Sequence, residues 1–581
     1  MNIVTEITIE KLNQHLVDIK IEFTTSHDNP ILEMPSWTPG SYLIREYARH
    51  VQNLKSLNID GNNLQVDKVS KNNWKIICAS GTRIVVNYEV YAFELTVRTS
   101  YLDNRKALLI PASLCMYIVN HHTNETSKDE EITLKFNIPS TWKMYSSLLK
   151  KENDYFVKNF DELVDTPIAM GSLDVIKELQ YNYDDNGKEI PNTVVFVGDA
   201  SNEDINKFAL DLQKLQDCSI KMFGKLPYNR YIWLLYITNN GRGGLEHKYS
   251  NASIIPRYMF KDPKDYAKVL SLEAHEHFHV YNVKRIRPQQ LGPFDYSSEV
   301  YTRLLWVAEG LTSFYDNIFL ARSQLVDRNS YWEMIADDLK RYYQIPGRFI
   351  DSIESSSFDA WIKLYRPDEN SVNSTISYYL KGGIVGMMLD LEIRSQTNWN
   401  ASLDTFYKYM FGEYEKDPTK GFIENDLQSL IESSTSTDLT IFWTKYISGK
   451  EEIDLEKYLN ILGMNIEKSS TDNVPYAGIN FKVRSTSVQS ILRDSPAEKA
   501  GLYAKDEIIA LNGYKVTSKN FEKVLKNHES NDLVNITLFR DGKLIDIDLR
   551  LENPIMDKIA IVEAKEITDQ QKKLLDVFFY S

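Results

Sequence analysis

Three histidines and two glutamates fall within one short stretch of the sequence, EAHEHFH (273–279). A helix advances about 100° per residue, so His275 and His279 face the same side and both imidazoles can reach one ion. Glu276 lies beside that face, where a carboxylate can take a proton from an attacking water. This HExxH spacing is typical of zinc hydrolases. It predicts one Zn²⁺ per chain, two histidine ligands and Glu276 as the general base.

The other polar residues of this stretch are expected to have supporting roles. His277 points about 200° away from His275, and we expect it to pack in the interior and to hydrogen-bond Glu273 one turn back. Asn282 falls near the ligand face, where its side-chain amide oxygen could orient a ligand N–H. The basic run KRIR (284–287) is expected to stabilise the helix C-terminus, with contact to substrate carboxylates as the alternative.

Two histidines leave a catalytic zinc site one protein ligand short. Glu309 is the candidate, because it lies in the helical and otherwise apolar stretch LLWVAEGLTSFYD (304–316). A lone carboxylate is costly to bury in such a stretch unless it meets a cation. We therefore expect Glu309 to be the third ligand, with a partly exposed glutamate as the alternative.

A second acidic residue follows a glycine pair in NNGRGGLEHKYSN (239–251). Gly243 and Gly244 would let another part of the chain come close. If this strand is an edge strand, it can pair with an extended peptide, and Glu246 can then receive a substrate ammonium group. A glycine-rich turn with an exposed acid is the alternative.

Paired tyrosines begin the helical stretch TISYYLKGGIVGMMLDLEIR (375–394). A phenol is a suitable hydrogen-bond donor to the oxyanion that forms when water attacks a carbonyl. Tyr378 and Tyr379 are both candidates for this role, and packing at a helix start is the alternative.

Composition and charge exclude several classes of protein. The chain is 43% hydrophobic and 25% charged, as soluble globular proteins are, and its net charge of −14 argues against nucleic acid as a partner. Three cysteines, Cys78, Cys115 and Cys218, lie too far apart to indicate a disulfide framework or a thiolate metal site. Since no stretch reads as a signal peptide or a membrane span, we expect a cytoplasmic protein with no membrane partner; a periplasmic location is the alternative if a leader has been removed.

The 581 residues predict a multidomain α+β protein. Short alternating strands predict an N-terminal β-sandwich over 1–172, and strands followed by helices predict a catalytic domain over 173–460. A Ser-rich joint precedes another set of short strands around a small helix at 470–556, and an amphipathic tail is expected over 557–581.

Taken together, these segments resemble the glycyl aminopeptidase family of zinc metallopeptidases, the PDZ-containing branch of the gluzincin clan. The resemblance extends over nearly the whole chain. MPSWTPGSYLIREYARHV (34–51) is similar to the N-terminal signature of that family, HEHFHVYNVKRIRP (275–288) to its zinc helix and WVAEGLTSFY (306–315) to its third-ligand helix. YAGINF (476–481) and VQSILRDSPAEKAGLYAKDEIIALNGYKV (488–516) resemble the carboxylate-binding loop and the turn signature of a PDZ domain.

The resemblance implies a thermolysin-like catalytic domain with His275, His279 and Glu309 as zinc ligands and Glu276 as the base. It also implies that Glu246, in GGLEH, is similar to the amine-recognising glutamate of a related, larger aminopeptidase family.

The same comparison places a Tyr-x-Lys-Gly pattern on Tyr379, Lys381 and Gly382, which favours Tyr379 over Tyr378 as the oxyanion donor. The implied activity is hydrolysis of the N-terminal residue, often glycine or alanine, from peptides with a free N-terminus. The alternatives are a zinc endopeptidase whose substrates are delivered by the PDZ domain, and a non-catalytic scaffold that binds peptides. The PDZ domain is expected either to bind a peptide C-terminus or to pack against the catalytic domain; the oligomeric state is not predicted.

Overall fold

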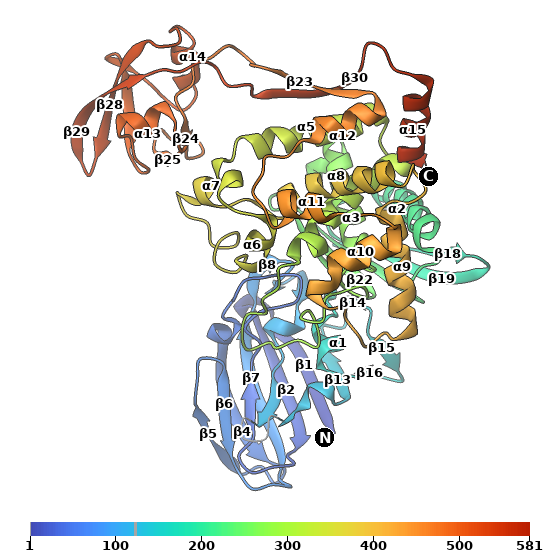
Figure 1. Ribbon diagram of the computed structural model, residues 1–581. Helices are drawn as coiled ribbons and strands as arrows, with labels where there is room; N and C mark the ends of the chain where they lie inside the picture. The colour runs from blue at the N-terminus through green and yellow to red at the C-terminus, as the bar shows by residue number, and fades with distance from the viewer. Residues whose placement is uncertain (1, 121–124, 581) are drawn as a thin grey trace. The chain divides into compact units, whose positions relative to one another are not determined.

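The computed structural model describes residues 2–120 and 125–580 (Figure 1). The chain forms two compact units. One runs through Tyr301 and includes Tyr407–Glu424, and the other holds Thr302–Phe406 and the chain from Asn425 onward. The division falls inside the stretch predicted to be the catalytic domain, so its helices belong to both units.

The N-terminal part of the first unit is built from two mainly antiparallel sheets, drawn in blue to cyan in Figure 1. Their alternating burial, as in β1, turns one side chain in two towards a shared apolar core that includes Ile7, Ile19 and Val86. In spatial order, the larger sheet is β12 (Glu125–Thr126), β11 (Tyr117–Asn120), β3 (Ile31–Glu33), β6 (Asn73–Ile77), β5 (Asn63–Lys68), β4 (Val51–Asn58), β7 (Arg83–Tyr91), β2 (Leu16–Thr24), β1 (Ile3–Lys11), β13 (Ile132–Asn137), β16 (Asp154–Val157) and β15 (Leu149–Lys151). The smaller is β14 (Trp142–Ser146), β17 (Ile168–Ser172), β10 (Lys106–Leu109), β9 (Thr99–Leu102) and β8 (Phe93–Thr96).

A third, mixed sheet follows in the same unit. Its order is β18 (Ile176–Asp185), β19 (Lys188–Gly198), β20 (Tyr231–Thr238), β22 (Ser250–Pro256) and β21 (Gly243–Glu246). The central strand β20 pairs in parallel on both sides and is buried over nearly its whole length, which explains its continuous apolar run. The strand β21 is antiparallel to β22 and forms the sheet edge.

Among the described residues, the α-helices that lie entirely in this unit are α1 (Phe160–Val164), α2 (Asn202–Phe223) and α3 (Pro263–Phe278). Helix α2 begins with a capping box from Ser201. In α3, the Asp262 side chain accepts hydrogen bonds from the backbone N–H groups of Lys264 and Asp265, and Pro263 stands in the first turn. Helix α3 ends at Phe278, earlier than the sequence pattern predicts.

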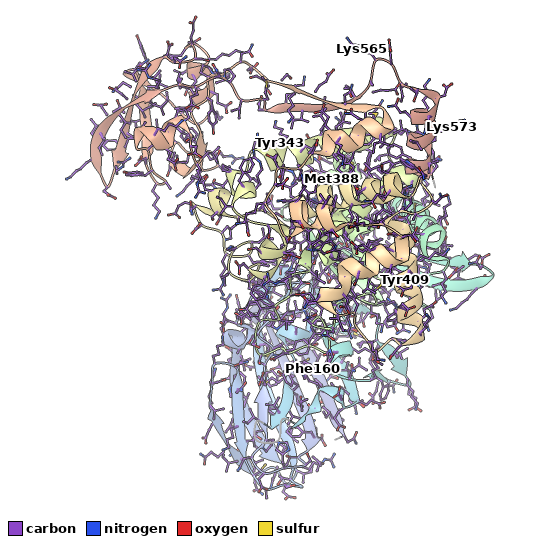
Figure 2. The ribbon with its side chains drawn as sticks, in the orientation of Figure 1. Phe160, Tyr343, Met388, Tyr409, Lys565 and Lys573 are labelled. Carbon is purple, nitrogen blue, oxygen red and sulfur yellow. The ribbon has the colours of Figure 1, made fainter. Side chains whose placement is uncertain are left out.

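The second unit is mainly helical. Before Met464 its α-helices are α4 (Leu311–Arg322), α5 (Arg328–Tyr343), α6 (Ile353–Phe358), α7 (Ser371–Ser374), α8 (Leu380–Gln396), α10 (Leu427–Thr435), α11 (Thr440–Phe442) and α12 (Leu455–Leu459); α9 (Leu403–Lys416) continues into the first unit. Helix α8 is buried on nearly all sides, which fits its lack of a polar face. Met388, labelled in Figure 2, is one of its fully buried residues.

The second unit also contains a small β-domain with its own apolar core, including Val488, Ile508 and Val534. Its elements are β24 (Ile479–Phe481), β25 (Val488–Ile491), α13 (Pro496–Ala500), β26 (Glu507–Leu511), β27 (Tyr514–Lys515), α14 (Phe521–Leu525), β28 (Leu533–Arg540) and β29 (Lys543–Arg550). The strands that enter and leave it, β23 (Met464–Ser469) and β30 (Lys558–Glu563), pair antiparallel and run side by side in Figure 1.

The C-terminal segment, which the sequence predicts to be an amphipathic tail, is folded onto the second unit. Besides β30 it contains α15 (Asp569–Tyr580), whose Phe578 and Phe579 rings contact Tyr331 and Trp332 of α5. The amphipathic pattern is thus explained by packing on α5. Of the helices in the described ranges, none combines the length and the apolar character needed to cross a bilayer.

Candidate metal centre

The imidazoles of His275 and His279 lie next to each other at the C-terminal end of α3. Their ring centroids are 4.6 Å apart and their planes are nearly perpendicular. The Nδ1 atom of His279 is 2.9 Å from the main-chain oxygen of Asn282. A carbonyl can only accept, so Nδ1 carries the proton and Nε2 keeps its lone pair for a metal ion. The expectation that the Asn282 side-chain amide would orient a ligand was wrong for His279, because the helix ends at Phe278 and the chain turns its carbonyl towards the ring.

Two carboxylates stand close to His279 in the same unit. Among the described residues, ligand atoms of Glu246, Glu276 and His279 all lie within 4.8 Å of one another. Burial raises the pKa of the Glu276 carboxyl well above its usual value; His275 and His279 lower it, and Glu246 and Glu273 raise it further. A carboxylate with a raised pKa is a better proton acceptor, as a general base must be. Imidazole nitrogens are donors that Zn²⁺ accepts, so the adjacent rings of His275 and His279 fit this ion.

The glycine pair of the edge strand β21 has an identified neighbour. A Cβ atom added to Gly244 would lie 2.0 Å from Oε1 of Glu276, whereas one added to Gly243 would meet only Arg98 Nη1 at 3.9 Å. The sequence predicted a close approach at these glycines. The structure places the Glu276 side chain directly against Gly244.

Glu246 is buried at the end of β21. A Cβ atom added to Gly40 would lie 2.6 Å from both carboxylate oxygens of Glu246, so the loop around Gly40 closes one side of this carboxylate. The Lys284 Nζ atom lies 3.8 Å from Glu246 and 2.9 Å from Asp165. Burial opposes the charge of Lys284, but Asp165 and Glu246 raise its pKa above the ordinary value.

His277 is a packing residue, as expected, but its predicted partner was wrong. Its Nε2 lies 2.9 Å from the Tyr228 hydroxyl and its Nδ1 3.2 Å from Ser219 Oγ, and its ring stacks on Trp233. Glu273 instead accepts a hydrogen bond from the Asn251 side chain. Burial, with a smaller effect of Arg285, lowers the pKa of His277 to about 3, so the ring is neutral.

The basic run after α3 has a structural role at Arg285. Its guanidinium donates to the main-chain oxygens of Val280 and Pro227, at 2.7 and 2.6 Å. Arg287 likewise donates to the main-chain oxygen of Gly292 at 2.7 Å. Lys284 differs, because it is directed towards two carboxylates.

In the second unit, Glu309 lies on a π-helical turn, Trp306–Gly310, that leads into α4. Such turns are frequent at functional sites. Its exposed fraction is 2%, so the alternative of a partly exposed glutamate is wrong. A Cβ atom added to Gly310 would lie 2.5 Å from the Tyr378 main-chain oxygen and 2.7 Å from the Gly382 Cα atom. The glycine contact brings this turn against the start of α8.

The two tyrosines at the start of α8 differ in exposure. Tyr378 is fully buried, whereas Tyr379 is partly exposed. The Tyr379 hydroxyl lies 3.1 Å from that of Tyr365. Burial, followed by the nearby carboxylate of Glu309, raises the pKa of Tyr379 well above its ordinary value, so this phenol stays protonated and can donate a hydrogen bond.

Two residues around Glu246 were not recognised from the sequence: Gly40, which packs against it, and Asp165, which pairs with its neighbour Lys284. Gly40 and Asp165 lie far from Glu246 along the chain, and no local spacing connects them with it. The only signal was the Pro-Gly turn in MPSWTPGSY, since Gly40 has a φ of +81°, which a side chain disfavours.

Comparison with known families gives three matches along the chain. Residues 5–172 match the peptidase M61 N-terminal domain, residues 268–385 match the M61 glycyl aminopeptidase family, and residues 475–551 match a PDZ domain. None of the curated proteins compared with the chain matches it.

The chain is also similar to solved structures. A crystal structure described as an aminopeptidase N family protein from Idiomarina loihiensis is 28% identical, with a TM-score of 0.90 over 99% of this chain and 100% of that chain. An M1 zinc metallopeptidase from Deinococcus radiodurans bound to a Tyr-Ser-Ala substrate is 12% identical, with a TM-score of 0.48 over 78% of this chain and 95% of that chain.

Proposed function

The chain belongs to the M61 glycyl aminopeptidase family, and from that premise we propose that it is a zinc-dependent aminopeptidase that removes the N-terminal residue from peptides. The observation that carries this proposal is that the carboxylates of Glu246 and Glu276 lie in sequence along the edge strand β21. A buried carboxylate suited to an ammonium group, Glu246, is two residues from Gly244, against which the candidate base Glu276 packs. A substrate whose terminal amine binds Glu246 would therefore have its first peptide bond near Glu276.

We propose that His275, His279 and Glu309 hold one Zn²⁺ per chain. Two imidazoles and a carboxylate are a ligand set of catalytic zinc sites, and Glu309 is a buried carboxylate on a π-helical turn. The stretch that matches the peptidase family contains all three. When bound, zinc supplies a Lewis acid that polarises the peptide carbonyl and activates water.

The residues around the ion have distinct tasks in this proposal. Glu276 accepts a proton from the attacking water and passes it to the leaving amine, for which its raised pKa is suited. Tyr379 donates its hydroxyl proton in a hydrogen bond to the oxyanion. The partial exposure of Tyr379, against the complete burial of Tyr378, supports this choice.

Glu246 binds the free amine of the substrate, and β21 with Gly243 and Gly244 pairs with its backbone as an edge strand. Because the loop around Gly40 packs against Glu246, it leaves little room for a substrate chain to continue beyond this residue, as an aminopeptidase requires. We propose a small first residue, glycine or alanine; the description of the matched family names glycine.

The PDZ domain is proposed to bind a peptide C-terminus at the loop that leads into β24. Support comes from the match over 475–551 and from Gly478, whose φ of +80° is typical of a glycine turn.

Replacing Glu246 with Gln tests the aminopeptidase proposal. The substitution keeps the shape packed against Gly40 but removes the charge that binds the amine. We expect kcat/KM for glycine p-nitroanilide to fall about a hundredfold, because a buried charged hydrogen bond is lost. Wild-type protein should cleave this substrate and reject its N-acetyl derivative, and the variant should lose this discrimination.

The matched control is Glu189→Ala, which removes an exposed carboxylate of β19 and should leave kcat/KM unchanged. Two results would contradict the proposal: full discrimination by Glu246→Gln, or efficient cleavage of acetylated peptides by the wild-type protein, which would favour an endopeptidase.

A further inference from the structure

A cation from the N-terminal part of the chain lies beside the edge strand β21. Arg98 stands in the turn between β8 and β9, and its Nη2 atom is 3.4 Å from the main-chain oxygen of Gly244. The turn is held by the Tyr47 hydroxyl, which donates to the Arg98 carbonyl at 2.7 Å, and by the Arg98 N–H, which donates to Thr96 Oγ1. The backbone of Arg98 is therefore fixed where its guanidinium reaches the strand.

The guanidinium of Arg98 has unused hydrogen-bonding capacity. Its Nε atom is buried without a hydrogen-bond partner among the residues that the structure describes. Its single contact with Gly244, at 3.4 Å, is long for a hydrogen bond. No ion pair joins Arg98 to a carboxylate of those described residues. A guanidinium offers five donors in a fork that matches a carboxylate, so this one can accept an anionic ligand.

The position of Arg98 along β21 identifies which part of a substrate it would meet. This step rests on the proposed function, with the substrate amine at Glu246 and the scissile bond near Glu276. Because Glu276 packs against Gly244, the leaving part of the peptide continues past Gly243, where a Cβ atom would lie 3.9 Å from Arg98 Nη1. An extended chain advances about 3.3 Å per residue, so only one or two residues separate the scissile bond from this guanidinium.

We infer that Arg98 binds the free α-carboxylate of short peptides and so directs the enzyme towards dipeptides and tripeptides. A carboxylate one or two residues after the scissile bond would pair with the guanidinium in a forked geometry and satisfy its unused donors. A longer peptide presents a neutral amide at the same place and lacks this interaction.

The test compares peptides that differ only at their C-terminus. Ala-Gly and Ala-Gly-Gly are assayed against their C-terminal amides with wild-type protein, Arg98→Gln and Arg98→Lys. Of the two peptides with a free C-terminal carboxylate, the one that is cleaved better should have a wild-type kcat/KM about tenfold to a hundredfold higher than that of its amide. This is the range of a charge-assisted hydrogen bond. Arg98→Gln should bring this ratio close to one, and Arg98→Lys, which keeps the charge, should restore part of it.

The control is Arg105→Gln, which removes the same charge from an exposed site in the same part of the chain and should keep the wild-type ratio. An unchanged ratio in Arg98→Gln, or a wild-type ratio of one, overturns the role of Arg98, even if the variant is less stable because the β8–β9 turn is no longer tied to β21. Cleavage of glycine p-nitroanilide by wild-type protein, measured in parallel, shows whether the proposed function itself holds, since this substrate has no α-carboxylate.

Discussion

Glu276→Gln is expected to lower kcat about a thousandfold while the protein still binds one zinc ion per chain. The amide keeps the volume and the packing against Gly244 but cannot accept a proton from water. General acid–base groups contribute about a hundredfold to ten-thousandfold to rate. Steady-state kinetics on glycine p-nitroanilide, together with metal analysis of the same sample, measures both parts of the expectation.

Glu273→Gln is the matched control for that substitution. Glu273 lies on α3 one turn before His277, is fully buried, and accepts a hydrogen bond from Asn251, which a glutamine oxygen can also accept. Its buried carboxyl has a pKa raised to about 7. Since Glu273 acts on the pKa of Glu276 only through its charge, the control should lose far less turnover than Glu276→Gln. Near wild-type activity in Glu276→Gln would reject the base assignment.

Gly244→Ala is expected to lower kcat/KM about a hundredfold. The added Cβ atom would lie 2.0 Å from Glu276 Oε1, so the carboxylate must move. A displacement of about 1 Å in a catalytic group costs about a hundredfold in rate. Neither Gly243 nor Gly244 has a positive φ, so the backbone itself tolerates alanine and the loss would come from the side-chain contact.

Gly243→Ala separates this contact from a general effect on β21. The two glycines are adjacent in the same strand, but a Cβ atom on Gly243 meets only Arg98 Nη1, at 3.9 Å. We expect less than a tenfold change in Gly243→Ala. Equal losses in the two variants would show that packing against Glu276 is not the cause.

Local spacing predicted the parts of the site that lie on one element. The 3.6-residue period places His275 and His279 on one face, and it correctly turned His277 towards the interior. Periodicity carries no information on where a helix ends. Asn282 was therefore assigned to the ligand face, although α3 ends at Phe278 and His279 interacts with the main-chain oxygen of Asn282 instead.

Contacts between distant elements could not be derived from spacing. The glycine pair predicted a close approach, but only the packing of β21 on α3 identifies Glu276 as the neighbour of Gly244. The contact of Gly40 with Glu246 connects the N-terminal strands with the mixed sheet, and Arg98 reaches β21 from another hairpin. Each of these contacts depends on tertiary packing, which cannot be predicted from composition or from the period of a sequence pattern.

The C-terminal segment shows the same limit. Its amphipathic period correctly indicated a helix with an apolar face, but not the surface that covers this face. Phe578 and Phe579 pack on Tyr331 and Trp332. The strand β30 pairs with β23, which precedes the PDZ domain in the sequence. A pattern within one segment cannot identify a partner so far away in sequence.

A crystal structure of the purified protein with data collected at the zinc absorption edge tests the central claim most directly. We expect one anomalous peak per chain, about 2.0–2.2 Å from a nitrogen of His275, a nitrogen of His279 and a carboxylate oxygen of Glu309. A peak bound by other residues, or zinc-loaded protein in which Glu309 stands away from the ion, would contradict it.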